Sequence, residues 1–138
     1  MANYFTHFSC VLDVGTRENA IRSLELRAKL AADIAEEESR DIGFILSIPE
    51  EEGGSVLWMR DDETGEPEHV IRFVLLCAET FDLKGLWGFQ WADTCSRPIL
   101  DAYGGGAHAI DLGERQSLGW TNTAEWLRIT LDRGDPDA

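Results

Sequence analysis

The sequence predicts an α+β fold with a ferredoxin-like β-α-β-β-α-β core, extended by a C-terminal β-hairpin and a short helix. Three observations predict this class. Apolar and polar residues alternate over several short segments, as in half-buried strands. Two longer segments instead repeat apolar residues at helical spacing. The order of these segments matches the split β-α-β arrangement. A different α+β sandwich is the alternative. Residues 1–131 are expected to form one domain.

The chain begins with a predicted strand over residues 4–14, whose even-numbered side chains are apolar except for Thr6. Gly15 ends this strand, and Thr16 is a natural N-cap for a helix that runs to about Glu37. The expected buried stripe of this helix consists of Ala20, Leu24, Ala28, Ala31 and Ala35, widened by Leu26, Leu30 and Ile34.

A predicted hairpin follows, with strands over residues 42–48 and 55–60 around an acidic, glycine-containing turn. Pro67 is suited to the first position of a second helix. The expected buried face of that helix consists of Val70, Ile71, Val74, Cys77, Ala78 and Phe81. Gly85 is the expected stop signal.

The second half of the chain contains a predicted strand over 86–91, whose aromatic residues share one face. A long loop over 93–106 is expected next, then a hairpin with strands over 107–112 and 116–120. Asn122 and Glu125 form a pair similar to a capping box for a short helix that holds Trp126, Leu127 and Leu131. Residues 132–138 are predicted to be a disordered acidic tail. The five tryptophans are expected mainly in the core.

The charge of the chain narrows the classes of partner. The 138 residues include 26 acids against 12 lysines and arginines, a formal net charge of −14. Such a surface repels phosphate groups, so we expect neither direct nucleic-acid binding nor membrane binding. It suits a basic protein surface, and simple solubility is the alternative reason for it. Three widely spaced cysteines and the absence of a recognisable signal peptide predict a cytoplasmic protein.

The acids are concentrated in one segment. Residues 36–68 contain twelve acids and two bases, a net charge of −10. The expected partner-binding residues lie in its turns and loops: Glu50, Glu51, Glu52, Asp61, Asp62 and Glu63. Carboxylates at this density could imitate a nucleic-acid backbone and occupy a basic channel of another protein. This segment supports the leading hypothesis, a non-enzymatic protein-interaction or inhibitor module that uses an acidic surface.

The alternative is a small enzyme or ligand-binding protein with its site in the loop region between Asp93 and His108. Cys95 would be the nucleophile, His108 its base, and Asp93 a further candidate catalytic group, although no known cysteine-enzyme signature is present. The candidate ligand-binding residues are Arg97, Asp101, Tyr103, Gly104, Gly105 and Gly106. Consecutive glycines can hold an anion with their N–H groups, or they can simply supply unusual loop conformations.

The sequence predicts neither a metal site nor a cofactor. No CxxC or HxxxH pair occurs, and the spacing of an EF-hand is absent. His7 and Cys10 would point to opposite faces of a strand, so they could not share an ion without a bulge. The oligomeric state stays open at this stage.

Three strings carry a resemblance: WGFQWADTCSRP, LDAYGGGAH and TNTAEWL. They are similar to a set of uncharacterised bacterial proteins that are frequent on mobile elements, and the likeness runs through most of the chain. The resemblance implies a bacterial, cytoplasmic origin. It implies no activity and no functional residue.

Overall fold

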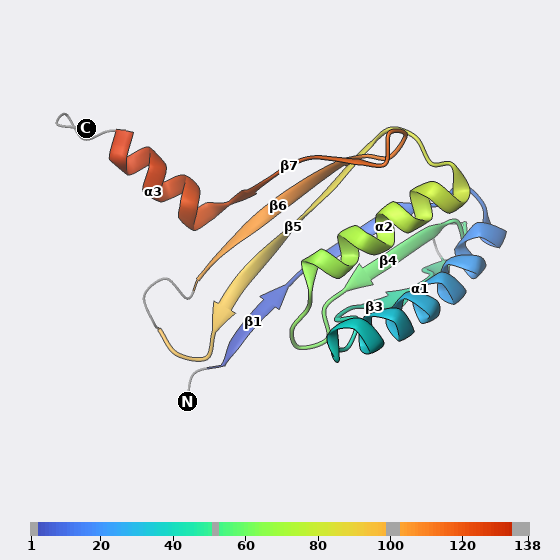
Figure 1. Cartoon of the computed structure of the whole chain (residues 1–138), viewed down its shortest axis with the longest axis horizontal. Helices are drawn as coiled ribbons and strands as arrows, with labels where there is room; N and C mark the ends of the chain where they lie inside the picture. Colours follow the sequence, from blue (N-terminus) through green and yellow to red (C-terminus); the bar gives the residue numbers. More distant parts are fainter. Residues whose placement is uncertain (1–2, 51–52, 99–102, 134–138) are drawn as a thin grey trace.

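The structure is a computed structural model that describes residues 3–50, 53–98 and 103–133. Its strands form two antiparallel sheets (Figure 1). The first sheet has the order β1 (Tyr4–His7), β5 (Leu86–Cys95), β6 (Gly104–Asp111) and β7 (Gln116–Asn122). The second has the order β2 (Ser9–Asp13), β4 (Val56–Arg60) and β3 (Ile45–Ser47). The predicted α+β class is confirmed.

The specific ferredoxin-like arrangement is not confirmed, because the segment predicted as one strand over 4–14 is divided between the sheets. His7 pairs with Ala92 in the first sheet, whereas Ser9 pairs with Arg60 in the second. Phe8 lies at the crossing point. Its N–H donates to the carboxylate of Asp61, 2.8 Å away, and its carbonyl accepts the Asp61 N–H. These bonds replace ladder bonds at the point where the chain changes sheets.

Helix α1 (Arg17–Glu38) begins as predicted, because the Thr16 side chain accepts the Asn19 N–H at 3.0 Å. Its buried residues are Ala20, Ser23, Leu30 and Ile34. Ala20, Leu30 and Ile34 were expected, but Leu24, Ala28 and Ala35 are exposed, so the expected alanine row is wrong in part. The core-facing stripe runs through the polar Ser23, whose hydroxyl donates to the Asn19 carbonyl.

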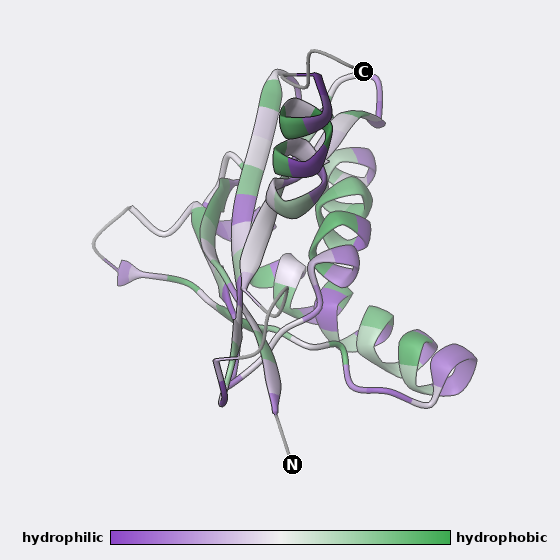
Figure 2. Ribbon diagram, turned by 90° about the vertical axis from the view of Figure 1, so that its left-hand side faces the viewer, coloured by the Kyte–Doolittle hydropathy of each residue, from purple (hydrophilic) through white to green (hydrophobic). Residues whose placement is uncertain are grey.

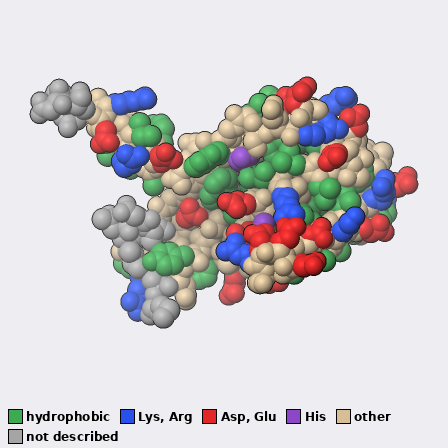
Figure 3. Space-filling view, viewed as in Figure 1, with side chains coloured by type: hydrophobic (Ala, Val, Ile, Leu, Met, Phe, Trp, Pro, Cys, Tyr) green, Lys and Arg blue, Asp and Glu red, His purple; other side chains and the backbone are tan. Residues whose placement is uncertain are grey.

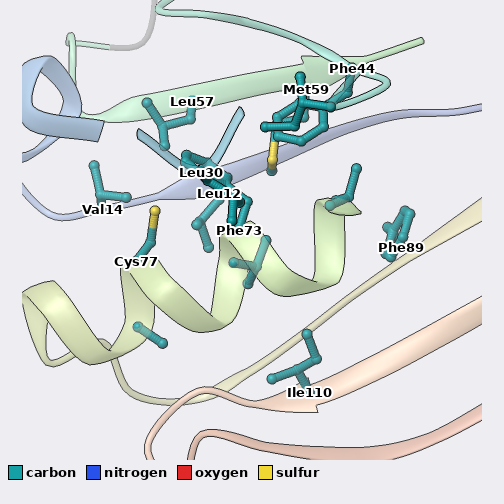
Figure 4. Close-up of a cluster of buried hydrophobic side chains, with 14 of the residues drawn as sticks. Leu12, Val14, Leu30, Phe44, Leu57, Met59, Phe73, Cys77, Phe89 and Ile110 are labelled. Carbon is teal, nitrogen blue, oxygen red and sulfur yellow. The ribbon is translucent and has the colours of Figure 1, made fainter. Parts of the chain in front are cut away.

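Helix α2 (Pro67–Phe81) has Pro67 in its first turn, as predicted. Figure 2 shows α1 and α2 on the same side of the strands. Side chains from both sheets converge on α2, with Leu57 and Met59 on one side of it and Phe89 and Ile110 on the other (Figure 4). The buried residues of α2 are His69, Val70, Phe73, Val74, Cys77 and Ala78. His69 and Phe73 were not expected there, whereas Ile71 and Phe81 are only partly buried.

Strand β5 is longer than predicted and removes most of the expected loop. It continues through Asp93 to Cys95, and β6 already begins at Gly104. The connection is therefore limited to residues 96–103. The β6–β7 hairpin is confirmed, and so is the Asn122 cap, whose side chain accepts the Glu125 N–H at 3.1 Å.

Helix α3 (Thr123–Arg133) leaves the end of the first sheet and projects away from the body (Figure 1). The predicted helix is confirmed, but it includes Asp132 and Arg133, which were expected in a disordered tail; residues 134–138 lie outside the described part. None of its residues is buried. No membrane-spanning helix occurs within the described ranges.

The expectation that the tryptophans lie mainly in the core is wrong. Trp120 and Trp126 are 65% and 61% exposed, and Trp58 is 36% exposed. Trp87 and Trp91 are partly buried. The indole N–H of Trp58 donates to the Ser9 hydroxyl and that of Trp87 to the Val11 carbonyl, so these rings lie where acceptors are available.

Candidate functional site

Acidic side chains gather where α1 ends and α2 begins (Figure 3). The antiparallel pairing of Ile45 with Arg60 brings the loop after β4 beside the segment that follows α1. Glutamates occupy the last turn of α1, at the negative end of the helix dipole, and this turn contains no basic residue. We call six exposed carboxylates here the acidic face: Glu36, Glu37, Glu38, Asp41, Asp62 and Glu63.

Only part of this charge is balanced by the fold. Arg72 lies 3.0 Å from Glu37, and this hydrogen bond raises the pKa of the arginine. The ring of His69 lies 3.1 Å from Glu38. The other four carboxylates form no ion pair with the described residues. The acidic face therefore keeps a net negative charge.

A cavity of about 510 Å³ opens beside the acidic face, between α1 and the loop before α2. Its charged lining consists of Arg27, Arg40, Asp41, Asp62 and Glu66. The guanidinium of Arg27 donates to the Phe44 carbonyl at 2.7 Å and lies over the Phe44 ring. Arg27 therefore stabilises the position of Phe44 in the wall of the cavity. The volume is suited to a small molecule or to one side chain of a partner.

The six predicted partner-binding residues do not form one surface. Glu50 lies before β4 and Asp61 after it, at opposite ends of the β3–β4 hairpin. Five strand residues separate them, which is roughly 17 Å. Glu51 and Glu52 lie outside the described residues. Asp62 and Glu63 are exposed on the acidic face, whereas Asp61 is bound internally. The expectation that most of the negative charge lies on one side is therefore wrong in part.

Asp61 belongs to a hydrogen-bond chain that sequence reasoning missed. Its carboxylate accepts from His7 Nδ1 at 2.8 Å, and His7 Nε2 lies 3.1 Å from the hydroxyl of Thr94. The same order of groups occurs in nucleophile–histidine–acid triads. Thr94, however, is a residue of the β5 ladder, where it pairs with Phe5 of β1. This hydrogen-bond chain links Asp61, which follows β4 of the second sheet, to His7 and Thr94 of the first sheet. We call it the clamp between the two sheets. No sequence motif could reveal it, because the three residues come from three distant segments.

Replacing Asp61 by alanine is expected to lower the free energy of unfolding by about 1–3 kcal/mol, because the Phe8 N–H and His7 lose their acceptor. Burial raises the pKa of Asp61, but the hydrogen bonds from His7 and Phe8 outweigh it and lower the pKa overall. The contribution of the carboxylate is therefore present above its unfolded pKa and is lost as the pH falls through the lower folded value.

Urea unfolding at a series of pH values measures this effect. Below about pH 4, the wild type should lose stability more steeply than Asp61→Ala. Asp62→Ala is the matched control, since Asp62 is exposed and its side chain makes no hydrogen bond with the described residues. Equal losses in the two variants would contradict the clamp.

The predicted catalytic residues are brought together only in part: Asp93 and His108 line the same groove, and Cys95 is not among its lining residues. Asp93 and Cys95 are in β5, and His108 pairs with Phe89 of the same strand. Cys95 is six residues beyond Phe89, roughly 20 Å along the strand, and Asp93 is roughly 13 Å along it. Cys95 is buried, while Asp93 accepts the Thr6 hydroxyl and His108 bonds to Ser117. Burial lowers the pKa of His108. A Cys95–His108 pair is therefore excluded.

The predicted ligand-binding loop is also altered. Gly104, Gly105 and Gly106 are strand residues paired with Asp93, Ala92 and Trp91, so they form no anion nest. Tyr103 donates its hydroxyl to the Cys95 carbonyl at 2.9 Å. Arg97 is exposed, and Asp101 lies outside the described residues.

The described ranges contain no group of three His, Cys, Asp or Glu residues that could hold a metal ion. Protein-family profiles, curated protein sequences and solved structures were compared with the chain, and no match was found.

Proposed function

We propose that the protein is a non-enzymatic interaction module that binds a basic surface of another protein through its acidic face. The observation that carries this proposal is the set of exposed glutamates at the negative end of α1, with no basic residue in that turn. Carboxylates in such a position repel one another and the helix dipole. A basic partner would relieve this repulsion, and the relief would make binding more favourable.

The acidic face also suits an inhibitor of a protein that binds nucleic acid. Such a protein has a groove of lysines and arginines, and its affinity for nucleic acid comes largely from neutralising them. Carboxylates of the acidic face would neutralise the same groups. The neighbouring cavity could accept one arginine or lysine side chain between Asp41, Asp62 and Glu66. We place this interaction in a reducing cytoplasm, where the three free cysteines would persist.

A pull-down from a bacterial lysate with the full chain tests this function. In Glu36→Gln/Asp41→Asn/Glu63→Gln, three carboxylates of the acidic face are neutralised without breaking any ion pair of the described residues. We expect a basic protein to be retained by the wild type at low salt, lost at high salt, and lost from the triple variant. Attraction between opposite charges weakens with ionic strength, which explains the expected salt dependence.

The control changes the same amount of charge elsewhere. Glu18, Glu25 and Glu79 are exposed helix residues outside the acidic face, so Glu18→Gln/Glu25→Gln/Glu79→Gln should retain the partner. Equal loss from both triple variants would show that only net charge matters and would contradict the proposal. Retention of a partner at high salt by all three proteins would also contradict it.

A ligand-binding role is the second candidate. Two spaces of about 510 Å³ favour it: the cavity between α1 and the loop before α2, and a groove that Asp93 and His108 help to line. Native mass spectrometry of the purified chain separates the two. A small molecule that copurifies at fixed stoichiometry would support ligand binding, and its absence together with a captured basic protein would support the interaction module.

We also infer that the body is a bent ferredoxin-like unit. If β1 and β2 are counted as one strand, the strands follow the order β5, β1–β2, β4, β3. The position of α1 and α2 on one side of the strands supports this inference (Figure 2).

A further inference from the structure

Strand β7 and helix α3, residues 116–133, form a segment that we call the arm. β7 is the edge strand of its sheet, and all but one of its residues are exposed. The arm exposes large apolar side chains that would normally be covered: Leu118, Trp120, Trp126, Leu127, Ile129 and Leu131. An apolar surface of this extent on a projecting element is typical of an interaction site.

Helix α3 in particular needs a partner. It has 11 residues and none of them is buried. A helix this short is only marginally stable in water, and most helices gain their stability by packing one face against other elements. Among the described residues, α3 lies mainly against β6 and β7. The packing surface that would stabilise α3 must therefore come from outside the arm.

A groove of about 510 Å³ in the body has the chemistry to receive such a helix. It lies where the sheet extends beyond the first turn of α2. Its apolar lining is formed by Pro67, Ile71, Trp91 and Trp120. Its acidic lining residues are Glu66, Glu68 and Asp93; Glu66 pairs with Arg40, which lines the groove together with His108. A band of hydrophobic side chains is visible on the sheet between α3 and α2 (Figure 3).

The α3 helix cannot fill the groove of its own chain. Asn122 ends β7 and Thr123 begins α3, so no connecting residues allow the helix to turn back over the sheet. The Asn122 cap holds this junction, and the helix continues away from the body (Figure 1). The helix of a second molecule has no such restriction.

We propose that the protein forms a dimer in which α3 of each copy packs into the groove of the other. The apolar residues of α3 face Ile71, Trp91 and Trp120 of the second copy. Charge selects a second copy as the occupant. The arm carries two acids and two arginines, so it has no net charge in a chain of −14. Arg133, and Arg128 beside its own-helix partner Asp132, complement Glu68 and Asp93, the acidic groove residues that form no ion pair with the described residues. Reciprocal exchange closes the assembly as a two-fold dimer.

The oligomeric state of the purified full chain tests this dimer. Light scattering after size exclusion, over a concentration series, should give twice the chain mass of 15.4 kDa. Trp126→Ser/Leu131→Ser removes exposed apolar groups of α3, so the body should stay folded by circular dichroism while the dimer dissociation constant rises about tenfold or more. A monomeric wild type, or a dimer unaffected by this double substitution, would overturn the proposal.

Charge reversal tests the specific pairing. Glu68→Arg alone, and Arg128→Glu/Arg133→Glu alone, should each be monomeric, because like charges would meet at both interfaces. An equimolar mixture of these two variants should form a heterodimer, since each interface then contains opposite charges. Failure of the mixture to associate would contradict the exchange. The acidic-face variant Glu36→Gln/Asp41→Asn/Glu63→Gln should dimerise as the wild type does, so this experiment is independent of the proposed partner.

Discussion

Replacing Phe73 by alanine is expected to lower the free energy of unfolding by about 3–5 kcal/mol. Phe73 is fully buried on α2, and its ring contacts the ring of Phe44 at a centroid distance of 5.5 Å. Figure 4 shows it among side chains of β2, β4 and α1. The cavity left by the missing ring would remove contacts to several elements at once. A domain of this size has a total stability of about 5–15 kcal/mol, so the variant should be close to unfolding at physiological temperature.

Urea unfolding followed by circular dichroism measures the loss, with Phe81→Ala as the matched control. Phe81 is the last residue of the same helix and is only partly buried, with the guanidinium of Arg22 5.6 Å from its ring centroid. Its removal should cost no more than about half as much, since the partly exposed site can admit water. Equal losses at the two positions would mean that α2 is not the element on which both sheets pack.

Phe73 also shows what could be predicted of the fold. The spacing of Val70, Val74 and Cys77 predicts the helix and most of its buried face. It does not predict the width of that face. Both sheets and α1 pack around α2, so the buried arc also includes residue 73, which a single stripe leaves out. The periodicity of apolar residues indicates one buried face of a helix, whereas a helix packed between two layers is buried on more than one side.

The two sheets could not be predicted from the residues of the first strand. Alternation continues through Phe8 without a break, because Phe8 and Leu12 are both buried. The change of sheet depends on the bonds from Asp61, 53 positions away in the sequence. Similarly, Asp62 and Glu63 could be predicted as exposed acids, but their place beside Glu36–Glu38 depends on the β3–β4 register.

The candidate catalytic site failed for a related reason. Pro98 and the three glycines favour a loop, and a loop would allow Cys95 and His108 to approach each other. Glycine also permits a strand where a neighbouring side chain needs the space of a Cβ atom. The three glycines are strand residues here, so β5 and β6 are longer than expected, and Cys95 and His108 lie far apart along the sheet.

Replacing Gly106 by alanine is expected to lower the free energy of unfolding by about 1–3 kcal/mol, because the added methyl group has no space. A Cβ atom on Gly106 would lie 2.8 Å from Cε2 of Trp91 and 2.6 Å from the carbonyl oxygen of Thr121. The carbonyl belongs to the β7 backbone and can move only with its strand. The indole of Trp91 would have to leave its place across Gly106. Since Trp91 and Trp120 line the groove, this substitution should also weaken the proposed dimer.

Gly104→Ala is the control within the same triple glycine. Its added Cβ would meet only the hydroxyl of Thr123, at 3.2 Å, and a small shift of that side chain would relieve the contact. In urea unfolding, the free energy of unfolding of Gly104→Ala should therefore lie within about 0.5 kcal/mol of the wild-type value, and that of Gly106→Ala should be clearly lower. Tryptophan fluorescence of the folded protein should change for Gly106→Ala alone, because only that substitution displaces an indole. If both variants behaved alike, the glycines would serve the loop conformation expected from the sequence, and the groove would not depend on the bare backbone at residue 106.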